Sequence, residues 1–89
     1  MDQEQLDKIQ DMAASLMTPA EIAILLNTDI TKFVYQATKK QDSEIYQAYY
    51  KGRLSTKLEL RKKVITLAKA GSPQAEVLAD KYITDTEIK

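Results

Sequence analysis

The feature that most constrains this chain is the helical spacing of its apolar residues, which is interrupted by strong helix-capping signals. A first amphipathic helix is predicted over residues 3–16 by apolar residues at intervals of three and four: Leu6, Ile9, Ala13 and Leu16. No segment shows the period-two alternation of a half-buried β-strand. We therefore expect an all-α protein.

A short second helix follows, and its start is marked by a capping box. Thr18 caps the free backbone N–H groups, Pro19 suits the first helical turn, and Glu21 reaches back to the cap. The buried side of this helix is expected to be formed by Ile22, Ala23, Leu25 and Leu26.

The third helix is separated from the second by about three residues. Asn27 suits the left-handed conformation that often ends a helix, and Asp29 is a favourable N-cap. The inward face is predicted to carry Ile30, Phe33, Val34 and Ala37. A longer helix followed by two short ones predicts a tri-helical helix-turn-helix unit, in a homeodomain-like arrangement, over residues 1–41.

The rest of the chain is expected to contain one long helix and one short helix. Asp42 or Ser43 is expected to cap the long helix, which runs without proline to Gly71 as the residue that ends it. Ser72-Pro73 starts the last helix. We expect residues 42–84 to form a helical hairpin that packs on the first unit or on another subunit. Residues 85–89 are expected to be a frayed tail.

The composition argues against an enzyme. Histidine and cysteine are both absent, which removes the commonest general base and metal ligand, as well as thiolate zinc sites. Asp7 and Asp11 are spaced as a carboxylate pair would be, but two solvated surface residues are the simpler interpretation. With two glycines, the chain has no phosphate-binding loop. We expect no catalytic residues, no metal site and no cofactor.

The acidic start of the chain lacks the apolar run of a signal peptide, and no segment approaches the apolar length needed to span a bilayer. We therefore expect a cytoplasmic protein without a membrane partner.

The net charge of zero conceals an asymmetry along the chain. Residues 1–29 carry a net charge of −5, residues 30–70 carry +7, and residues 71–89 carry −2. A basic segment is typical of a protein that binds a polyanion. The alternative is that oppositely charged segments neutralise each other within one chain or between chains.

The polar face of the third helix supplies the candidate DNA-binding residues. In a helix-turn-helix the second helix of the pair enters the major groove, where Gln can address adenine and Lys can address guanine or phosphate. With the apolar stripe inward, the outward and flanking residues are Thr31, Lys32, Tyr35, Gln36, Lys39 and Lys40. The alternative is an ordinary solvated face. Because Arg and Asn are absent from this face, no strong sequence preference is implied.

The long helix carries a basic row, formed by Arg53, Lys57 and Arg61 at i, i+4 and i+8. These cations either track phosphates or snorkel over apolar surface and pair with acids at an interface with another copy. Tyr46, Tyr49 and Tyr50 are expected to pack rather than to form a stacking platform.

Three stretches resemble phage terminase small subunits and related prophage proteins. They are residues 17–29 (MTPAEIAILLNTD), residues 45–53 (IYQAYYKGR), and the segment from Leu60 through AGSPQA at residues 70–75 to Tyr82. The resemblance implies a role in viral DNA packaging or in a prophage within a bacterial host cell. It implies a homo-oligomer, double-stranded DNA and a terminase large subunit as partners, and no catalytic site.

Carried onto this sequence, the resemblance implies DNA contacts on Lys32, Tyr35, Gln36 and Lys39. It also implies oligomer contacts from the long helix, including Leu54, Leu58 and Ile65. The alternative function is a helical protein–protein interaction or oligomerisation module without DNA binding, since a fold does not determine a function. A transcriptional regulator is a third interpretation, and it would require a discrete operator.

Overall fold

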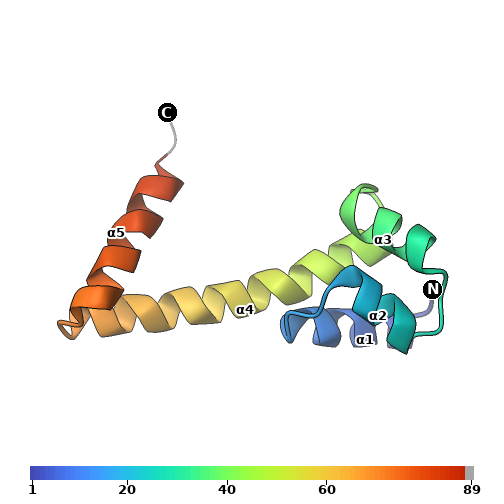
Figure 1. Cartoon of the computed structure of the whole chain (residues 1–89), viewed down its shortest axis with the longest axis horizontal. Coiled ribbons are helices and arrows are strands. Elements are labelled where there is room, and N and C mark those ends of the chain that lie inside the picture. Colours follow the sequence, from blue (N-terminus) through green and yellow to red (C-terminus); the bar gives the residue numbers. More distant parts are fainter. Residues whose placement is uncertain (88–89) are drawn as a thin grey trace. The chain divides into compact units, whose positions relative to one another are not determined.

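The computed structural model describes residues 1–87, and every regular element in this range is a helix. The helices are α1 (Gln3–Ala14), α2 (Pro19–Leu25), α3 (Ile30–Thr38), α4 (Glu44–Lys69) and α5 (Pro73–Thr86) (Figure 1). The all-α expectation is confirmed. The chain divides into two compact units, Met1–Thr56 and Lys57–Lys89, so the division falls inside α4 rather than near residue 41.

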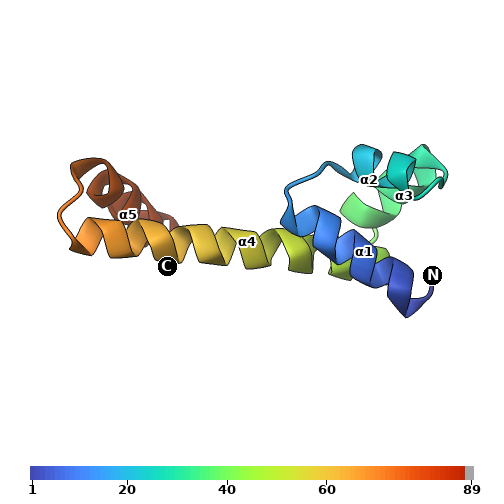
Figure 2. The ribbon, with the colours of Figure 1, turned by 90° about the horizontal axis from the view of Figure 1, so that it is seen from below.

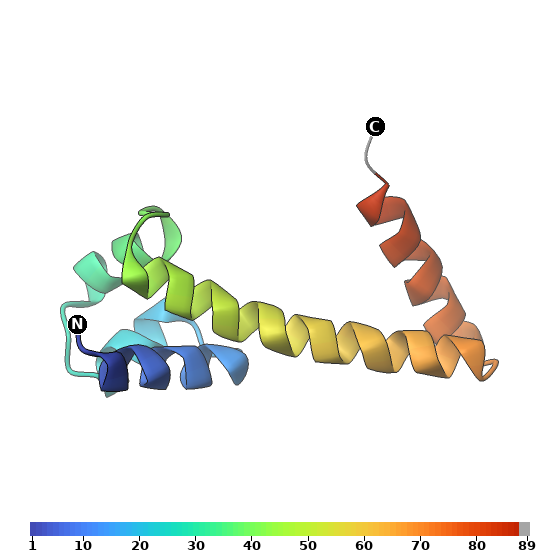
Figure 3. The same cartoon turned by 180° about the vertical axis from the view of Figure 1, so that it is seen from behind.

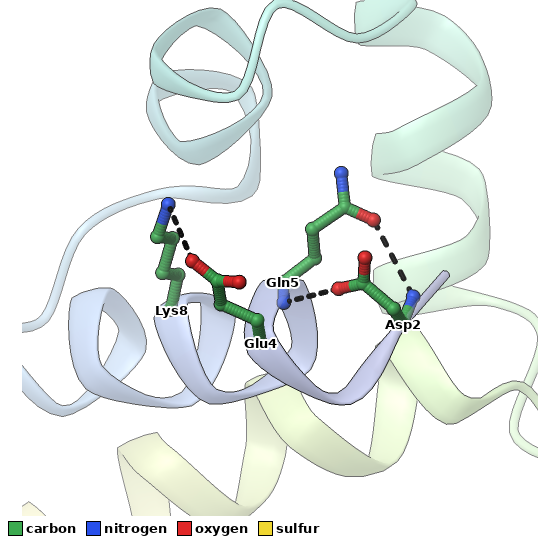
Figure 4. Close-up of polar contacts among 4 residues, drawn as sticks. All are labelled: Asp2, Glu4, Gln5 and Lys8. Carbon is green, nitrogen blue, oxygen red and sulfur yellow. Dashed lines mark hydrogen bonds and ion pairs between the residues drawn. The ribbon is translucent and has the colours of Figure 1, made fainter.

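Each helix begins at a side chain that accepts a hydrogen bond from a backbone N–H of the first turn. The caps are Asp2, Thr18, Asp29, Ser43 and Ser72. Two of them belong to reciprocal capping boxes, Asp2 with Gln5 and Thr18 with Glu21 (Figure 4 shows the first). These bonds satisfy donors that have no partner inside the helix, which explains why the helices begin where the sequence predicts.

Three helices end in the same hydrogen-bonding pattern, in which a left-handed residue follows the cap. Asn27 (φ 56°) ends α2 and Gly71 (φ 98°) ends α4, as expected for residue types that tolerate this conformation. Leu16 (φ 63°) ends α1 in the same way. Its N–H donates to the Ala13 carbonyl at 2.9 Å, and the N–H of Met17 donates to the Met12 carbonyl at 3.3 Å. The first helix therefore stops at Ala14, not at residue 16.

The core of the first unit is enclosed by α1, α2, α3 and the start of α4. Its largest fully buried side chains are Ile9 of α1, Ile22 of α2 and Phe33 of α3. α4 adds Ile45, Ala48 and Tyr49. α2 packs against α3, as Figure 2 shows.

α1 and the first part of α4 lie side by side (Figure 3). They approach each other closely at Gly52, which is buried. A Cβ atom at Gly52 would overlap the carbonyl oxygen of Gln10 and lie 2.9 Å from the Cβ of Ala13. One turn later, the hydroxyl of Thr56 donates to the carbonyl of Ala14, which is the last residue of α1. α4 is continuous through Gly52, so this glycine serves helix packing rather than a kink.

Three residues of the predicted apolar stripes are exposed, which corrects the sequence-based expectation. Leu16 is 51% exposed, Leu25 is 61% exposed and Ile30 is 45% exposed. Leu25 is the last residue of α2, Ile30 is the first residue of α3, and Leu16 lies beyond the end of α1. At these helix ends the core does not cover the side chain.

The second unit comprises the part of α4 from Lys57 onward together with the whole of α5, and the turn at residues 70–72 joins them. After this turn α5 folds back and diverges from α4 (Figures 1 and 3). Ala75, 5% exposed, is the one buried residue that is described in this unit. α5 continues to Thr86, so residues 85 and 86 are helical where a frayed tail was expected. Residues 88 and 89 lie outside the described range.

Candidate nucleic-acid interface

The outer face of α3 is set by the residues that anchor its inner face. Phe33, 2% exposed, and Ala37, fully buried, hold α3 against the core. Because Phe33 and Ala37 lie on one side of the helix, the residues on the opposite side face outward. The exposed members of the predicted site are Thr31, Lys32, Tyr35, Lys39 and Lys40, and Tyr35 is 59% exposed. Gln36 is half-buried, so it contributes less surface than expected.

The start of α3 places Lys32 in the first helical turn. Asp29 caps the helix by accepting a hydrogen bond from the Lys32 backbone N–H at 2.9 Å. The positive end of the helix dipole disfavours a cation at this place, by a few tenths of a kcal/mol or more. The position of Lys32 is therefore not explained by helix stability.

The end of α3 holds the other two lysines. The backbone N–H groups of Lys39 and Lys40 both donate to the Tyr35 carbonyl, at 2.8 Å and 3.3 Å. Cations at this end of a helix stabilise it by about 0.3–1 kcal/mol. Lys39 and Lys40 thus have a structural role available to them, in contrast to Lys32.

The turn after α3 is held in place by a serine. The Ser43 hydroxyl donates to the Gln36 carbonyl at 3.2 Å and accepts from the Tyr46 N–H at 3.0 Å. α3 and α4 are therefore tied together directly behind the lysines, and the outer face of α3 is presented on a fixed support.

Among the described residues, no carboxylate pairs with Lys32 in α3 or with Lys39 and Lys40, which directly follow it. Within residues 1–87 the one ion pair closer than 4.0 Å joins Lys8 and Glu4 on α1, at 3.8 Å (Figure 4). Lys32, Lys39 and Lys40 thus keep their full charge at the surface, where a polyanion gains most from it.

The arginines of the basic row are held by tyrosines. In the first unit, Arg53 donates to the Tyr49 hydroxyl at 3.4 Å, and its guanidinium carbon lies 5.8 Å from the ring centroid. In the second unit, the guanidinium carbon of Arg61 lies 4.2 Å from the ring centroid of Tyr82. Lys57 is exposed. The two arginines therefore lie against aromatic rings, where cation–π attraction contributes.

The three tyrosines at the start of α4 pack together. Tyr49 is buried, and its ring meets the ring of Tyr50 edge to face, at 5.3 Å between centroids. The rings of Tyr46 and Tyr50 lie 4.5 Å apart. The packing interpretation of this cluster is confirmed.

The carboxylates of the described residues do not gather into a site. Asp7 and Asp11 line a shallow polar hollow with Gln10, Ala14 and Ser55. No group of three or more acidic, histidine or cysteine side chains within residues 1–87 could hold a metal ion.

A perturbed pKa is found at Glu21, where the backbone N–H of Thr18 donates to the carboxylate and lowers the pKa of Glu21.

One feature of the surface was missed by sequence reasoning. Between α4 and α5 of the second unit lies a groove of about 570 Å³, with Arg61 and Lys69 on one wall and Glu76 and Asp80 on the other. The available signal was the pair of small residues, Ala68 and Ala79, that leaves this space open.

Among the described residues, no helix has both the length and the apolar character needed to cross a membrane.

Comparisons of the chain with models of known protein families, with curated proteins and with solved structures found no match.

Proposed function

We propose that this chain is a DNA-binding protein that presents the outer face of α3 to the major groove. The observation that carries the proposal is the exposed, unpaired Lys32 beside the exposed Tyr35, on a helix whose opposite face is anchored by Phe33. In this proposal α2 and α3 form the helix-turn-helix pair, and α1 supports them.

Binding rests mainly on phosphate contacts. Lysine is a point charge that attracts phosphate without the bidentate geometry of arginine, and Tyr35 adds a hydroxyl donor. Gln36 is half-buried, so its side-chain amide presents less surface for reading a base edge. We therefore propose weak sequence preference and strong dependence on salt.

The biological setting that we propose is viral DNA packaging or a prophage function. This part rests on the resemblance of residues 17–29, 45–53 and 60–82 to terminase small subunits. In that setting several copies act together on one DNA, which raises avidity without new contacts, and a terminase large subunit is the protein partner.

The direct test is a fluorescence-anisotropy titration of the full chain with duplex DNA at low and at moderate salt. We expect salt-sensitive binding that is lost when Lys32→Glu is combined with Lys39→Glu. The matched control combines Lys62→Glu with Lys63→Glu, which changes the net charge equally on exposed residues of α4. Circular dichroism verifies that both variants remain helical.

The outcomes separate this function from its rival. Equal loss in both variants would indicate a non-specific charge effect and would overturn the role of α3. Absence of binding at low salt, in a folded sample, would favour the protein-interaction module instead. That second function is favoured by the exposed apolar residues of the second unit: Leu58, Leu60, Ile65, Leu67, Val77, Leu78 and Ile83.

A further inference from the structure

The second unit buries very little of its own apolar surface. Ala75 is its one buried residue among those described, and the side chains of Ile65 and Ile83, on the two sides of the groove, are exposed. A pair of helices with so small a core gains little from the hydrophobic effect by itself. Contiguous exposed apolar surface with a polar rim is characteristic of a protein-binding face.

The charges around this groove have opposite signs on its two sides. The α4 wall contributes Arg61 and Lys69, and the α5 wall contributes Glu76 and Asp80. The surface is therefore complementary to a copy of itself.

Within residues 1–87 these charges are not paired with one another or with other side chains. No ion pair of the described residues involves Arg61, Lys69, Glu76 or Asp80. Arg61 instead lies over the ring of Tyr82, which positions the guanidinium at the groove without neutralising it. Unpaired charges at the edge of an apolar groove select the orientation of a partner and suppress wrong pairings.

We propose that the groove is occupied by a second copy of this chain, in a two-fold pairing of the second units. In this pairing α5 of each copy lies in the groove of the other. The Glu76 and Asp80 carboxylates of one copy then face the Arg61 and Lys69 cations of its partner, and Ile65 and Ile83 are covered. In a two-fold interface every contact occurs twice, once in each direction, which suits a surface that carries basic and acidic residues on the same face. The proposal does not depend on DNA binding.

The experiment measures the mass of the full chain without DNA, by light scattering coupled to size exclusion and by sedimentation equilibrium. We expect twice the 10.1 kDa of one chain. Ile83→Asp places a charge in the groove and should weaken the pairing more than about tenfold. Val77→Asp is the matched control, because Val77 is exposed on the same helix but does not line the groove, and it should remain a dimer.

Charge reversal tests the orientation. One variant carries Arg61→Glu and Lys69→Glu, and the other carries Glu76→Lys and Asp80→Lys. Each should be monomeric alone, because both sides of the groove then have one sign, and mixing the two should restore a dimer. Lys62→Glu with Lys63→Glu should leave the dimer intact.

Three results would overturn the proposal. They are a monomeric wild-type chain, a mixture of the two reversed variants that stays monomeric, and a closed assembly larger than a dimer. A monomer that still binds DNA would overturn this interface alone, whereas a dimer that binds no DNA would overturn the proposed function alone.

Discussion

Gly52 of α4 lies so close to α1 that an added Cβ would approach the Ala13 Cβ to 2.9 Å and overlap the carbonyl oxygen of Gln10. Real Cβ atoms do not come this close to backbone, so either helix would have to move. The nearby hydrogen bond from the Thr56 hydroxyl to the Ala14 carbonyl holds the two helices at this distance. The close crossing of α1 and α4 thus requires a residue without a Cβ atom at position 52.

Gly52→Ala is expected to destabilise the first unit by about 1–3 kcal/mol, the usual range for overpacking. Helix propensity acts in the opposite direction, since alanine in a helix interior is favoured over glycine by about 1 kcal/mol. Urea unfolding followed by circular dichroism measures the balance. Lys51→Ala, on an exposed neighbour, should change stability by less than about 0.5 kcal/mol. A Gly52→Ala protein more stable than the wild type would contradict the close approach.

Leu16→Gly is expected to stabilise the protein by about 0.5–1 kcal/mol. Leu16 occupies the left-handed region at φ 63°, where a side chain costs about 1–2 kcal/mol and glycine has no such cost. Its side chain is largely exposed, so little packing is lost. Leu16→Ala keeps the strained backbone and should not stabilise. If thermal unfolding ranks alanine above glycine, the left-handed cap is not the determining factor.

The capping box of α2 should weaken in acid. The hydrogen bond from the Thr18 N–H lowers the pKa of Glu21, so its stabilising contribution is complete above the unfolded value of about 4.3. That contribution is lost as the pH falls through the lower folded pKa. Glu21→Gln keeps the hydrogen bond but does not titrate.

Denaturant midpoints measured between neutral pH and pH 3 should therefore fall further for the wild type than for Glu21→Gln. Because every other carboxylate is common to both proteins, the difference isolates Glu21. Parallel curves for the two proteins would argue against a titrating cap.

Lys32→Gln is expected to weaken DNA binding and to lower the slope of log K against log salt by about one. The reason is that this substitution removes one cation, and with it one released counterion, while glutamine keeps the helix. Lys81→Gln, on α5, serves as the control with the same change in charge. An unchanged salt slope for Lys32→Gln would place the DNA elsewhere on the protein.

The helix boundaries were predictable because their signals act within a few residues. Thr18 and Glu21 bond to each other across three positions, and Asn27 and Gly71 end their helices because their residue types tolerate the left-handed region. Leu16 ends α1 with the same geometry, but leucine carries no such signal. The end of α1 was therefore placed two residues too late.

The outward direction of Lys32 and Tyr35 also followed from the sequence, because Phe33 and Ala37 define the inner face at helical spacing. The reduced exposure of Gln36 was not predictable. It depends on the turn that leads to α4, where Ser43 donates to the Gln36 carbonyl from seven residues away.

The sequence by itself determined the all-α class, the starts of the helices and the polar face of α3. Tertiary structure alone decided which apolar residues are covered and that α1 packs closely against Gly52. It also decided that a groove lies between α4 and α5, with basic residues on one wall and acidic residues on the other. The physical reason is range: capping and periodicity act along one helix, whereas burial depends on which neighbour arrives from a distant part of the chain.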